Sequence, residues 1–294
     1  LEAYAAALAA PPRLAEPVER AVRQGDGWQV QTARSRYLAP HLVVATGLND
    51  VPRRPAWPGL DAFPGPVLHS SQYANGNAFR GEAVLVVGFG NSGGEIALDL
   101  AEHGARPTLA VRGPVNVVPR RLLGRPIEEI AGWLERLPPA VADVVGRAAR
   151  RLRFGDLERY GLSFAHQSPS RQVQERARIP LIDVGTVAMI RRGSIRVRPG
   201  VQSLEGSRVR FVDGVSEAFD AIVLATGYRP GFAAFLDTGE VFDATLPLRL
   251  PRAPGLHFCG FTVTAGGTLS RIAREAAAIA RAIAPQPGSN PAGS

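Results

Sequence analysis

The sequence predicts an α/β protein organised around a parallel sheet, and two observations lead to this prediction. Residues 83–87 form a short valine-rich apolar run, which is typical of a strand buried on both faces. Glycines follow that run at G-x-G-x-x-G spacing, at positions 88, 90 and 93, and apolar residues then recur at helical spacing from Ile96. A strand, a tight turn and a helix in this order predict a Rossmann-like dinucleotide-binding unit.

Each residue of this turn has a predicted role. Gly88 allows the chain to turn, Gly90 leaves no side chain between the backbone and a pyrophosphate, and Gly93 lets the helix approach the strand. The N–H groups of the first helical turn, which includes Asn91 and Ser92, would face the phosphates, where the helix dipole favours negative charge. We therefore predict that these five residues bind a dinucleotide pyrophosphate.

The second nucleotide feature is Arg112, at the end of the next predicted strand, 107–111. It stands nineteen residues beyond Gly93, close to where an NAD site keeps a carboxylate for the ribose hydroxyls. A cation at this place suits a 2′-phosphate, so the sequence favours NADPH over NADH. A merely solvated arginine is the alternative.

The remaining elements follow from periodicity and from breaker residues. Before the glycine turn, the sequence predicts a helix over 1–10, strands over 27–32, 37–39 and 41–47, and a proline-stiffened loop over 52–66. After it, the sequence predicts a helical region over 127–154 interrupted by Pro138-Pro139, and a loop over 162–178. A strand over 179–185 with a short helix through 189 follows, and then strands over 195–197, 209–212, 219–224 and 255–261. The chain is predicted to close with a helix over 269–284 and a disordered tail over 285–294.

Two predicted strands end in the same tripeptide. Ala45-Thr46-Gly47 closes one, and Ala225-Thr226-Gly227 closes the other. Small residues at the carboxyl end of a strand permit close approach by a ligand, although a plain strand-to-loop glycine is the alternative. Two strands that end alike fit two crossings of the chain between paired nucleotide-binding domains.

Composition excludes several classes of protein. The net charge is +8, but every one of the 34 basic residues is arginine, which indicates a bias along the whole chain and argues against a nucleic-acid partner. Missing lysine excludes a P-loop and Schiff-base chemistry. The single cysteine, Cys259, excludes an internal disulfide, a redox dithiol and a zinc cluster.

The hydrophobicity pattern predicts a soluble, cytoplasmic protein. No apolar run approaches the roughly 18 residues of a membrane span, and the first residues lack the order of a signal peptide. For the helical region over 127–154, composition favours a covering helical hairpin over a membrane anchor. The predicted partners are a small-molecule substrate and O₂, with neither nucleic acid nor membrane; a homodimer is left open.

Several motifs together make the sequence resemble the flavin-containing monooxygenases, and above all their YUCCA-type branch. Phe63-x-Gly65-x-x-x-His69-x-x-x-Tyr73 matches the identifying motif of that family at every fixed position. The glycine turn at 88–93 resembles its NADPH motif, and the segments 183–186, 219–222 and 224–228 resemble family segments in the same order. The similarity runs from about residue 1 to 284.

This resemblance implies two Rossmann-like dinucleotide-binding domains, with the NADPH domain inserted into the FAD domain. Residues 1–73 and 215–284 would belong to the FAD domain, 74–214 would form the NADPH domain, and 285–294 would be a tail. Such enzymes open with a first G-x-G-x-x-G lobe for FAD, and nothing before Ala83 supplies it. We therefore expect an N-terminally truncated FAD domain, whose activity alone is in doubt.

The resemblance also implies the activity and the cofactors. NADPH would reduce FAD, and a flavin C4a-hydroperoxide would oxygenate a small substrate: an aryl pyruvate such as indole-3-pyruvate, a soft nitrogen or sulfur nucleophile, or a ketone. No side chain is predicted to be catalytic and no metal is predicted. An oxidoreductase without oxygenation and an inactive NADPH-binding fragment are the alternatives.

The predicted cofactor-binding residues extend beyond the glycine turn and Arg112. His69 and Tyr73 would order the linker beside NADP. Six further residues would lie near the crossings between the domains or on the FAD side: Thr46, Gly47, Thr226, Gly227, Gly260 and Phe261.

Overall fold

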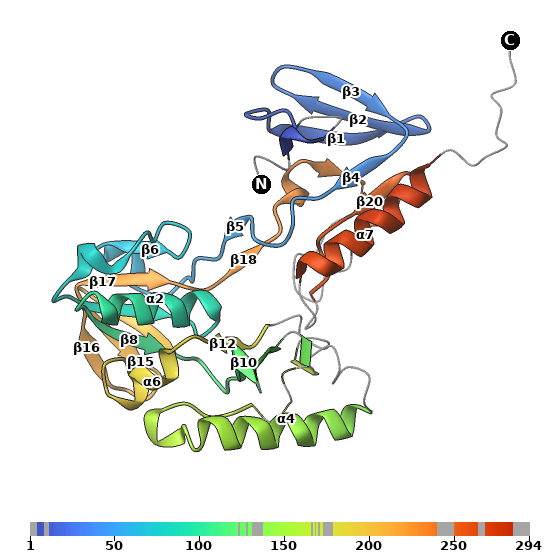
Figure 1. Ribbon diagram of the computed structural model, residues 1–294. Helices are drawn as coiled ribbons and strands as arrows, with labels where there is room; N and C mark the ends of the chain where they lie inside the picture. The colour runs from blue at the N-terminus through green and yellow to red at the C-terminus, as the bar shows by residue number, and fades with distance from the viewer. Residues whose placement is uncertain are drawn as a thin grey trace, which may run out of the picture. The chain divides into compact units, whose positions relative to one another are not determined.

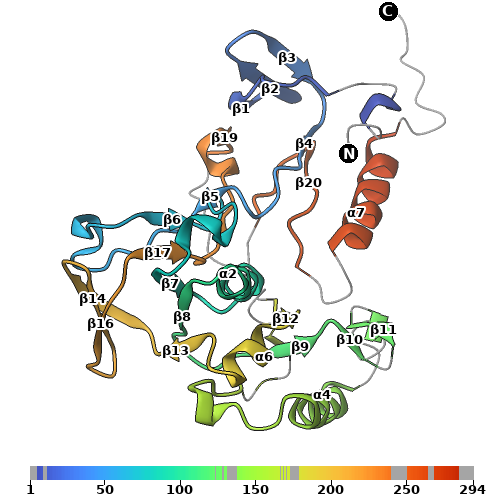
Figure 2. The same ribbon diagram turned by 60° about the vertical axis from the view of Figure 1, so that its left-hand side comes forward.

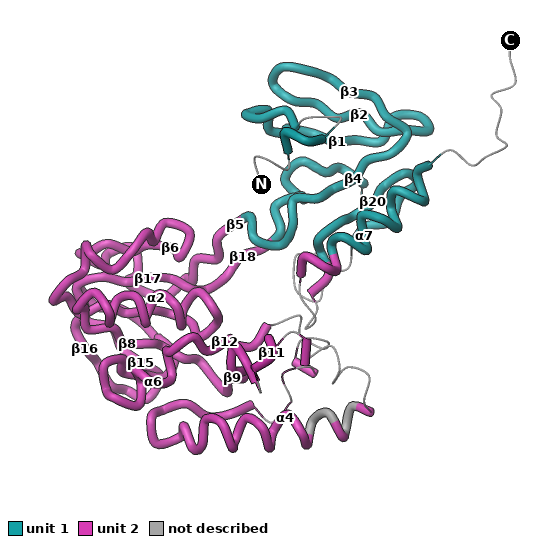
Figure 3. Tube along the Cα trace, in the orientation of Figure 1, with its two compact units in different colours: residues 1–50, 230–261, 272–294 teal, residues 51–229, 262–271 magenta. Residues whose placement is uncertain are grey.

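The computed structural model describes residues 5–8, 12–122, 124–127, 129–130, 138–165, 167, 169, 171–172, 179–239, 250–263 and 268–284. The chain divides into two compact units. Unit 1 comprises Leu1–Asp50, Pro230–Phe261 and Ile272–Ser294, and unit 2 comprises Val51–Arg229 and Thr262–Arg271 (Figure 3). Most of unit 2 is therefore inserted, in sequence, between segments of unit 1. The predicted domain boundaries at 73 and 214 stay predictions.

Unit 2 is built on a five-stranded sheet in which all neighbouring strands are parallel (Figure 1). Its spatial order is β13-β8-β7-β17-β6. The strands are β6 (Val67–His69), β7 (Ala83–Val87), β8 (Arg106–Ala110), β13 (Arg196–Arg198) and β17 (Ala221–Leu224). Strand β7 is buried along most of its length, as its valine-rich sequence predicts.

Helix α2 (Asn91–Glu102) follows β7 and packs against the sheet. It buries Ile96, Ala97 and Leu100 in the same apolar cluster as Val84 and Val86. Helix α6 (Thr186–Arg191) adds Val187 and Ile190 to this cluster, and helix α4 (Pro139–Phe154) contributes Phe154. A second cluster in unit 2 gathers around Leu85, Phe211 and Ile222.

Short elements complete unit 2. They are the paired strands β9 (Val117–Pro119) and β12 (Leu181–Asp183), the hairpin of β10 (Arg121–Leu122) and β11 (Arg125–Pro126), the sheet of β14 (Val201–Glu205), β15 (Arg208–Phe211) and β16 (Ser216–Ala218), the pair of β5 (Val51–Pro52) and β18 (Tyr228–Arg229), and 3-10 turns at Leu60–Ala62, Gly76–Phe79 and Glu158–Tyr160.

The described part of unit 1 contains two small sheets. One has the order β19-β1-β2-β3, from β1 (Val18–Gln24), β2 (Gly27–Thr32), β3 (Arg36–Ala39) and β19 (Leu236–Asp237). The other pairs β4 (Leu42–Val44) with β20 (Leu256–Phe258) in parallel. The core of unit 1 contains Trp28, Phe232 and Phe261, and α7 (Thr268–Ile283) belongs to this unit from Ile272 onward. A 3-10 turn spans Phe232–Ala234.

The predicted strand 83–87, the glycine turn and the helix of unit 2 are confirmed. Several strands were not predicted, among them β1, β9, β14 and β16. Strand β1 was missed, because Val18–Gln24 carries five exposed residues and no simple apolar alternation. Pro52, at the start of the predicted loop 52–66, belongs to β5, which pairs with β18. The same loop leads directly into β6, which pairs with β17. Neither strand was predicted, because each is paired by a strand distant in sequence. Most of the predicted helix over 1–10 and the tail over 285–294 lie outside the described residues.

Candidate functional site

The carboxyl ends of the five parallel strands of unit 2 lie in one row. Leu224 of β17 is in register with His69 of β6 and with Val87 of β7. Val87 is in register with Ala110 of β8, which in turn pairs with Arg198 of β13. Open parallel sheets bind ligands beyond this edge, beside the strand where the order reverses, and here that strand is β7 (Figure 2).

The glycines that follow β7 divide into two kinds. A Cβ on Gly88, whose φ is +113°, would lie 2.4 Å from the carbonyl oxygen of Ala225, and a Cβ on Gly93 would lie 2.1 Å from that of Gly88. A Cβ on Gly90 would meet no atom within 4 Å. Gly88 and Gly93 are thus required by packing within the protein, whereas the backbone at Gly90 is open to a ligand.

The first turn of α2 lies directly beyond this loop. Its N-cap residue is Gly90, which has no side chain to bond the first N–H groups, and the turn contains no acidic residue. The turn can therefore accept an anion from outside the protein. Asn91 has a second role, because its Oδ1 accepts a hydrogen bond of 2.8 Å from the N–H of Ile182 and joins α2 to β12. Ser92 follows within the same turn.

Two arginines lie near the end of β8, and only one is available to a ligand. Arg198 donates to Glu217 through Nε at 2.7 Å and through an η nitrogen. Arg112 is exposed, lies beside Gly200, and makes no ion pair with any residue in the described part of the chain. The arrangement therefore leaves Arg112 as the cation that could meet a phosphate.

His69 is buried and contacts the protein on both ring nitrogens. Its Nε2 lies 3.1 Å from the carbonyl oxygen of Gly227, while the N–H of Ser71 donates to its Nδ1. Because a carbonyl only accepts, Nε2 carries the hydrogen in this arrangement. The edge of the ring also meets Tyr228 at 4.8 Å between centroids. His69 thus joins the end of β6 to the segment after β17.

Tyr73 joins the same segment to α2. Its hydroxyl donates a 2.6 Å hydrogen bond to Oδ2 of Asp99, and its ring stacks on Phe79. Burial and the bond to Asp99 raise the pKa of Tyr73 above its ordinary value. The other carboxylate oxygen of Asp99 lies 3.2 Å from Nδ1 of His103. Sequence reasoning missed Asp99, since an acid on an amphipathic helix carries no signal of a partner twenty-six positions away.

Thr226 and Gly227 lie where β17 leads into β18. The Thr226 hydroxyl donates to the carbonyl oxygen of Arg53, and the carbonyl oxygen of Gly227 accepts from the N–H of Arg53 at 2.9 Å. Gly227 has a φ of +77°. These contacts show how the Ala-Thr-Gly ending is held, and a cofactor role for either residue stays a prediction.

In unit 1, the other predicted residues meet at the end of a second parallel pair. Val44 of β4 is in register with Phe258 of β20, so Thr46-Gly47 and Gly260-Phe261 leave the strands at one edge. Gly47 has a φ of +71° and open space where a Cβ would stand.

Gly260 and Phe261 are held by protein contacts at this edge. The N–H of Gly260 donates to Glu275 at 2.9 Å. Phe261 is buried and packs edge-on against Phe232 and Phe258, so its visible role is in the core.

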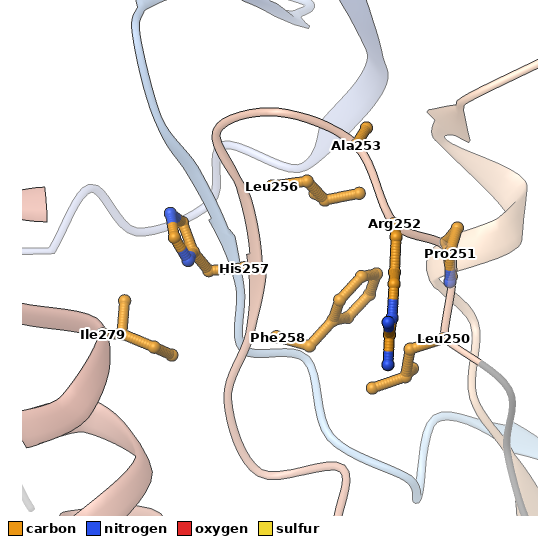
Figure 4. Close-up of a pocket in the computed structure, with 8 residues that line it drawn as sticks. All are labelled: Leu250, Pro251, Arg252, Ala253, Leu256, His257, Phe258 and Ile279. Atoms are coloured by element: carbon orange, nitrogen blue, oxygen red, sulfur yellow. The ribbon is translucent and has the colours of Figure 1, made fainter. Parts of the chain in front are cut away.

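Unit 1 also contains a hollow of about 890 Å³ beside β20 (Figure 4). It is lined by Leu250, Pro251, Arg252, Ala253, Leu256, His257, Phe258 and Ile279. None of the predicted cofactor-binding residues lines it. The Nε2 of His257, one of the lining residues, lies 3.3 Å from Nδ1 of His41.

Comparison with known proteins points to one family. The model of the family described as "Flavin-binding monooxygenase-like" matches residues 26–272. The indole-3-pyruvate monooxygenase YUCCA1 of Oryza sativa subsp. japonica is 40% identical over 273 residues, covering 89% of this chain and 67% of that protein. The chain thus spans about two thirds of this relative.

Solved structures share the fold. A flavin-containing monooxygenase from Stenotrophomonas maltophilia superposes with a TM-score of 0.65 at 21% identity, covering 93% of this chain and 72% of that one. Cyclohexanone monooxygenase from Rhodococcus sp. Phi1, bound to NADP⁺, gives a TM-score of 0.58 at 18% identity, covering 91% and 65%. The chain therefore shares the α/β fold of these structures.

Proposed function

Because the chain belongs to the flavin-binding monooxygenase-like family, we propose that it is an NADPH- and FAD-dependent monooxygenase acting on a small organic substrate. The observation that supports this most directly is the glycine turn of unit 2. Two of its glycines are demanded by backbone packing, while Gly90 and the first turn of α2 are left open to an anion. That division is what a dinucleotide site requires.

The chain's own residues would bind and orient the two cofactors. Gly88, Gly90 and Gly93, with Asn91 and Ser92, would bind the NADPH pyrophosphate. Arg112 would bind the 2′-phosphate, since an exposed guanidinium without an ion-pair partner in the described chain suits a dianion.

His69 and Tyr73 would act through the protein, because His69 bonds Gly227 and Tyr73 bonds Asp99. They would hold β6 and the following segment in place beside the NADPH site.

In unit 1, Thr46, Gly47 and Gly260 would approach FAD at the edge formed by β4 and β20. When bound, NADPH and FAD supply hydride transfer and oxygen activation, so no acidic or nucleophilic side chain is required for the chemistry. The contribution of the protein is to hold both cofactors and to exclude water. The predicted arrangement of an NADPH domain inserted into an FAD domain belongs to this proposal.

For the substrate we propose an aryl pyruvate, because the relative at 40% identity is named an indole-3-pyruvate monooxygenase. The chain covers 67% of that relative, so the activity of the whole protein is carried over as a hypothesis.

The test uses the purified chain. NADPH binding is measured by fluorescence titration, retained flavin by the visible spectrum after removal of excess FAD, and product by chromatography with indole-3-pyruvate. Oxygenated product in proportion to NADPH consumed supports the proposal. NADPH consumption that yields only peroxide supports an oxidoreductase. NADPH binding without retained flavin identifies an NADPH-binding protein, and absence of NADPH binding rejects the site itself.

A further inference from the structure

The described side-chain contacts between α4 and the rest of unit 2 lie along one side of the helix. Phe154, at its carboxyl end, is 1% exposed and belongs to the main apolar cluster. Arg150, one turn earlier, is buried, donates to Oδ1 of Asn116 and to the carbonyl oxygen of Ala165, and lies over the ring of Phe164. These contacts fix which side of α4 faces the protein and which side faces outward.

The outward side carries an unusual set of apolar residues. Val141, Val144, Val145 and Leu152 are exposed to 46%, 57%, 44% and 91%. Spacings of three, four and seven positions place them in one line along the helix, together with exposed Ala148, on the side away from Arg150. We call these five residues the α4 stripe. Figures 1 and 2 both show α4 at the outside of unit 2.

Exposed arginines flank the stripe. Arg147 and Arg151 lie along one side of it and Arg153 along the other, and all three are exposed. Arg153 lies over the ring of Phe154, so its charge stays beside the helix. A helix with a fully exposed leucine, a row of valines and a margin of cations has the pattern of a helix that lies at a charged interface.

The chemistry of this surface discriminates between occupants. A second copy of the chain paired through the same stripe would bring the two arginine margins together, and like charges oppose that contact. A nucleic acid gains nothing from exposed valine and leucine. Protein interfaces are enriched in aromatic anchors, and the stripe has none. An anionic bilayer suits both the aliphatic stripe and its flanking arginines. The aliphatic side chains would enter the boundary of the acyl chains, and the guanidinium groups would meet the lipid phosphates.

We propose that the α4 stripe binds the surface of an anionic lipid bilayer, with α4 lying in the plane of the interface. This inference does not depend on the proposed oxygenase function, and it replaces the prediction from sequence that no membrane is a partner. Within the described residues, no helix is both long enough and apolar enough to cross a bilayer. Because α4 would lie in the plane of the interface, the association would be peripheral and reversible.

The strength of membrane association should depend both on the flanking arginines and on the aliphatic residues of the α4 stripe. An arginine near an anionic surface contributes about a fivefold gain in partitioning, and the gain falls as salt screens it. Leu152 contributes through burial of its side chain. Vesicles of phosphatidylcholine alone lack the charge and should bind the chain far more weakly than vesicles that also contain phosphatidylglycerol.

The experiment is vesicle flotation of the full chain with both lipid compositions, at low and high salt. Leu152→Glu and the pair Arg147→Gln with Arg151→Gln test the stripe and its margin. Leu38→Glu and the pair Arg34→Gln with Arg36→Gln are matched controls, since Leu38 is 70% exposed and both arginines are exposed on the β2–β3 hairpin of unit 1. Circular dichroism confirms that every variant is folded.

The proposal expects a drop in partitioning of about tenfold or more for each α4 variant and less than about twofold for each control. Equal loss in the controls would mean that the +8 net charge alone attracts the chain, and it would overturn the proposal. No binding to anionic vesicles overturns it as well. A dimer in sedimentation velocity that Leu152→Glu abolishes, without vesicle binding, assigns the stripe to a second copy.

Discussion

The two units place glycines at the carboxyl edges of parallel strands for different physical reasons. In unit 2, the spaces beside Gly88 and Gly93 are filled by backbone carbonyl oxygens at 2.4 Å and 2.1 Å from where a Cβ would stand. In unit 1, a Cβ on Gly47 would meet no atom within 4 Å. The nearest atom to a Cβ on Gly260 would be a side-chain carbon of Ile272, at 3.6 Å. Both unit 1 glycines have a positive φ, as Gly88 does, but no backbone atom fills the space beside them.

This difference follows from the number of strands around each edge. Strand β7 has a neighbour on either side, and α2 folds back over its end, so backbone meets backbone. Strand β4 has β20 as its single partner in the part of the chain that the structure describes. A glycine in the first setting is required by backbone packing, whereas a glycine in the second setting is required only by the φ of its turn.

The largest expected effect is on the packing of unit 2. Gly93→Ala should lower the free energy of unfolding by about 3 kcal/mol, because its Cβ overlaps the carbonyl oxygen of Gly88 and the backbone must shift. Gly90→Ala is the matched control, with an expected cost below about 1 kcal/mol, since its Cβ enters open space. Urea denaturation measures both. Equal costs would remove the distinction between the two kinds of glycine.

Cofactor selectivity should depend on Arg112. Arg112→Ala is expected to weaken NADPH binding by about a hundredfold and to leave NADH binding within about threefold, because only the 2′-phosphate loses a charged partner. Fluorescence titration with the two nucleotides measures the ratio. Arg80→Ala removes another exposed arginine of unit 2 and should change neither value. An equal loss of affinity for NADPH and NADH would show that Arg112 contacts a group that both nucleotides share, and not the 2′-phosphate.

The attachment of the segment after β6 should depend on the Tyr73 hydroxyl. Tyr73→Phe is expected to cost about 1.5 kcal/mol, since Asp99 loses a hydrogen bond in a partly buried setting. Tyr160→Phe is the control, because its ring contact with Arg159 does not involve the hydroxyl. Thermal and urea unfolding report the loss. An unchanged stability would mean that water replaces the hydroxyl without cost.

The same bond gives a pH dependence. The folded-state pKa of Tyr73 is raised, so its contribution is complete below the ordinary tyrosine pKa of about 10 and is lost as pH rises toward the folded value. The stability difference between the wild type and Tyr73→Phe should therefore shrink above about pH 10, because the phenylalanine does not titrate. Urea unfolding of both proteins across that range measures it. A difference that grows with pH would contradict the raised pKa.

The smallest effect is expected in unit 1. Gly47→Ala should cost about 1 kcal/mol, because its φ of +71° is strained for alanine although the space is free. Gly47→Asn should cost less, since asparagine tolerates this conformation. Denaturation of the two variants compares them directly. A cost for Gly47→Ala as large as for Gly93→Ala would show that the edge of unit 1 is packed by backbone after all.

The sequence by itself determined the central strand, its glycine turn and its helix, because burial of β7 and the turn at 88–93 are local properties of apolar pattern and glycine spacing. The motif from Phe63 to Tyr73 also identified the family. What its fixed residues contact was decided by tertiary structure. His69 forms a hydrogen bond with Gly227, which lies 158 positions away. Tyr73 forms one with Asp99, which lies 26 positions away.

The tertiary structure alone decided which of two arginines near the same sheet edge is exposed and free to meet a ligand. Arg112 follows β8 and Arg198 ends β13 of the same sheet, but Arg198 donates to Glu217 whereas Arg112 is exposed. In α4, Arg150 is buried while Arg151 and Leu152 face outward. The periodicity of apolar residues predicts secondary structure, whereas hydrogen bonding and burial depend on groups that folding brings together from distant parts of the sequence. For that reason the sequence predicted the dinucleotide turn and favoured a covering helical hairpin over 127–154, but it did not show that Val144 and Leu152 of α4 are exposed.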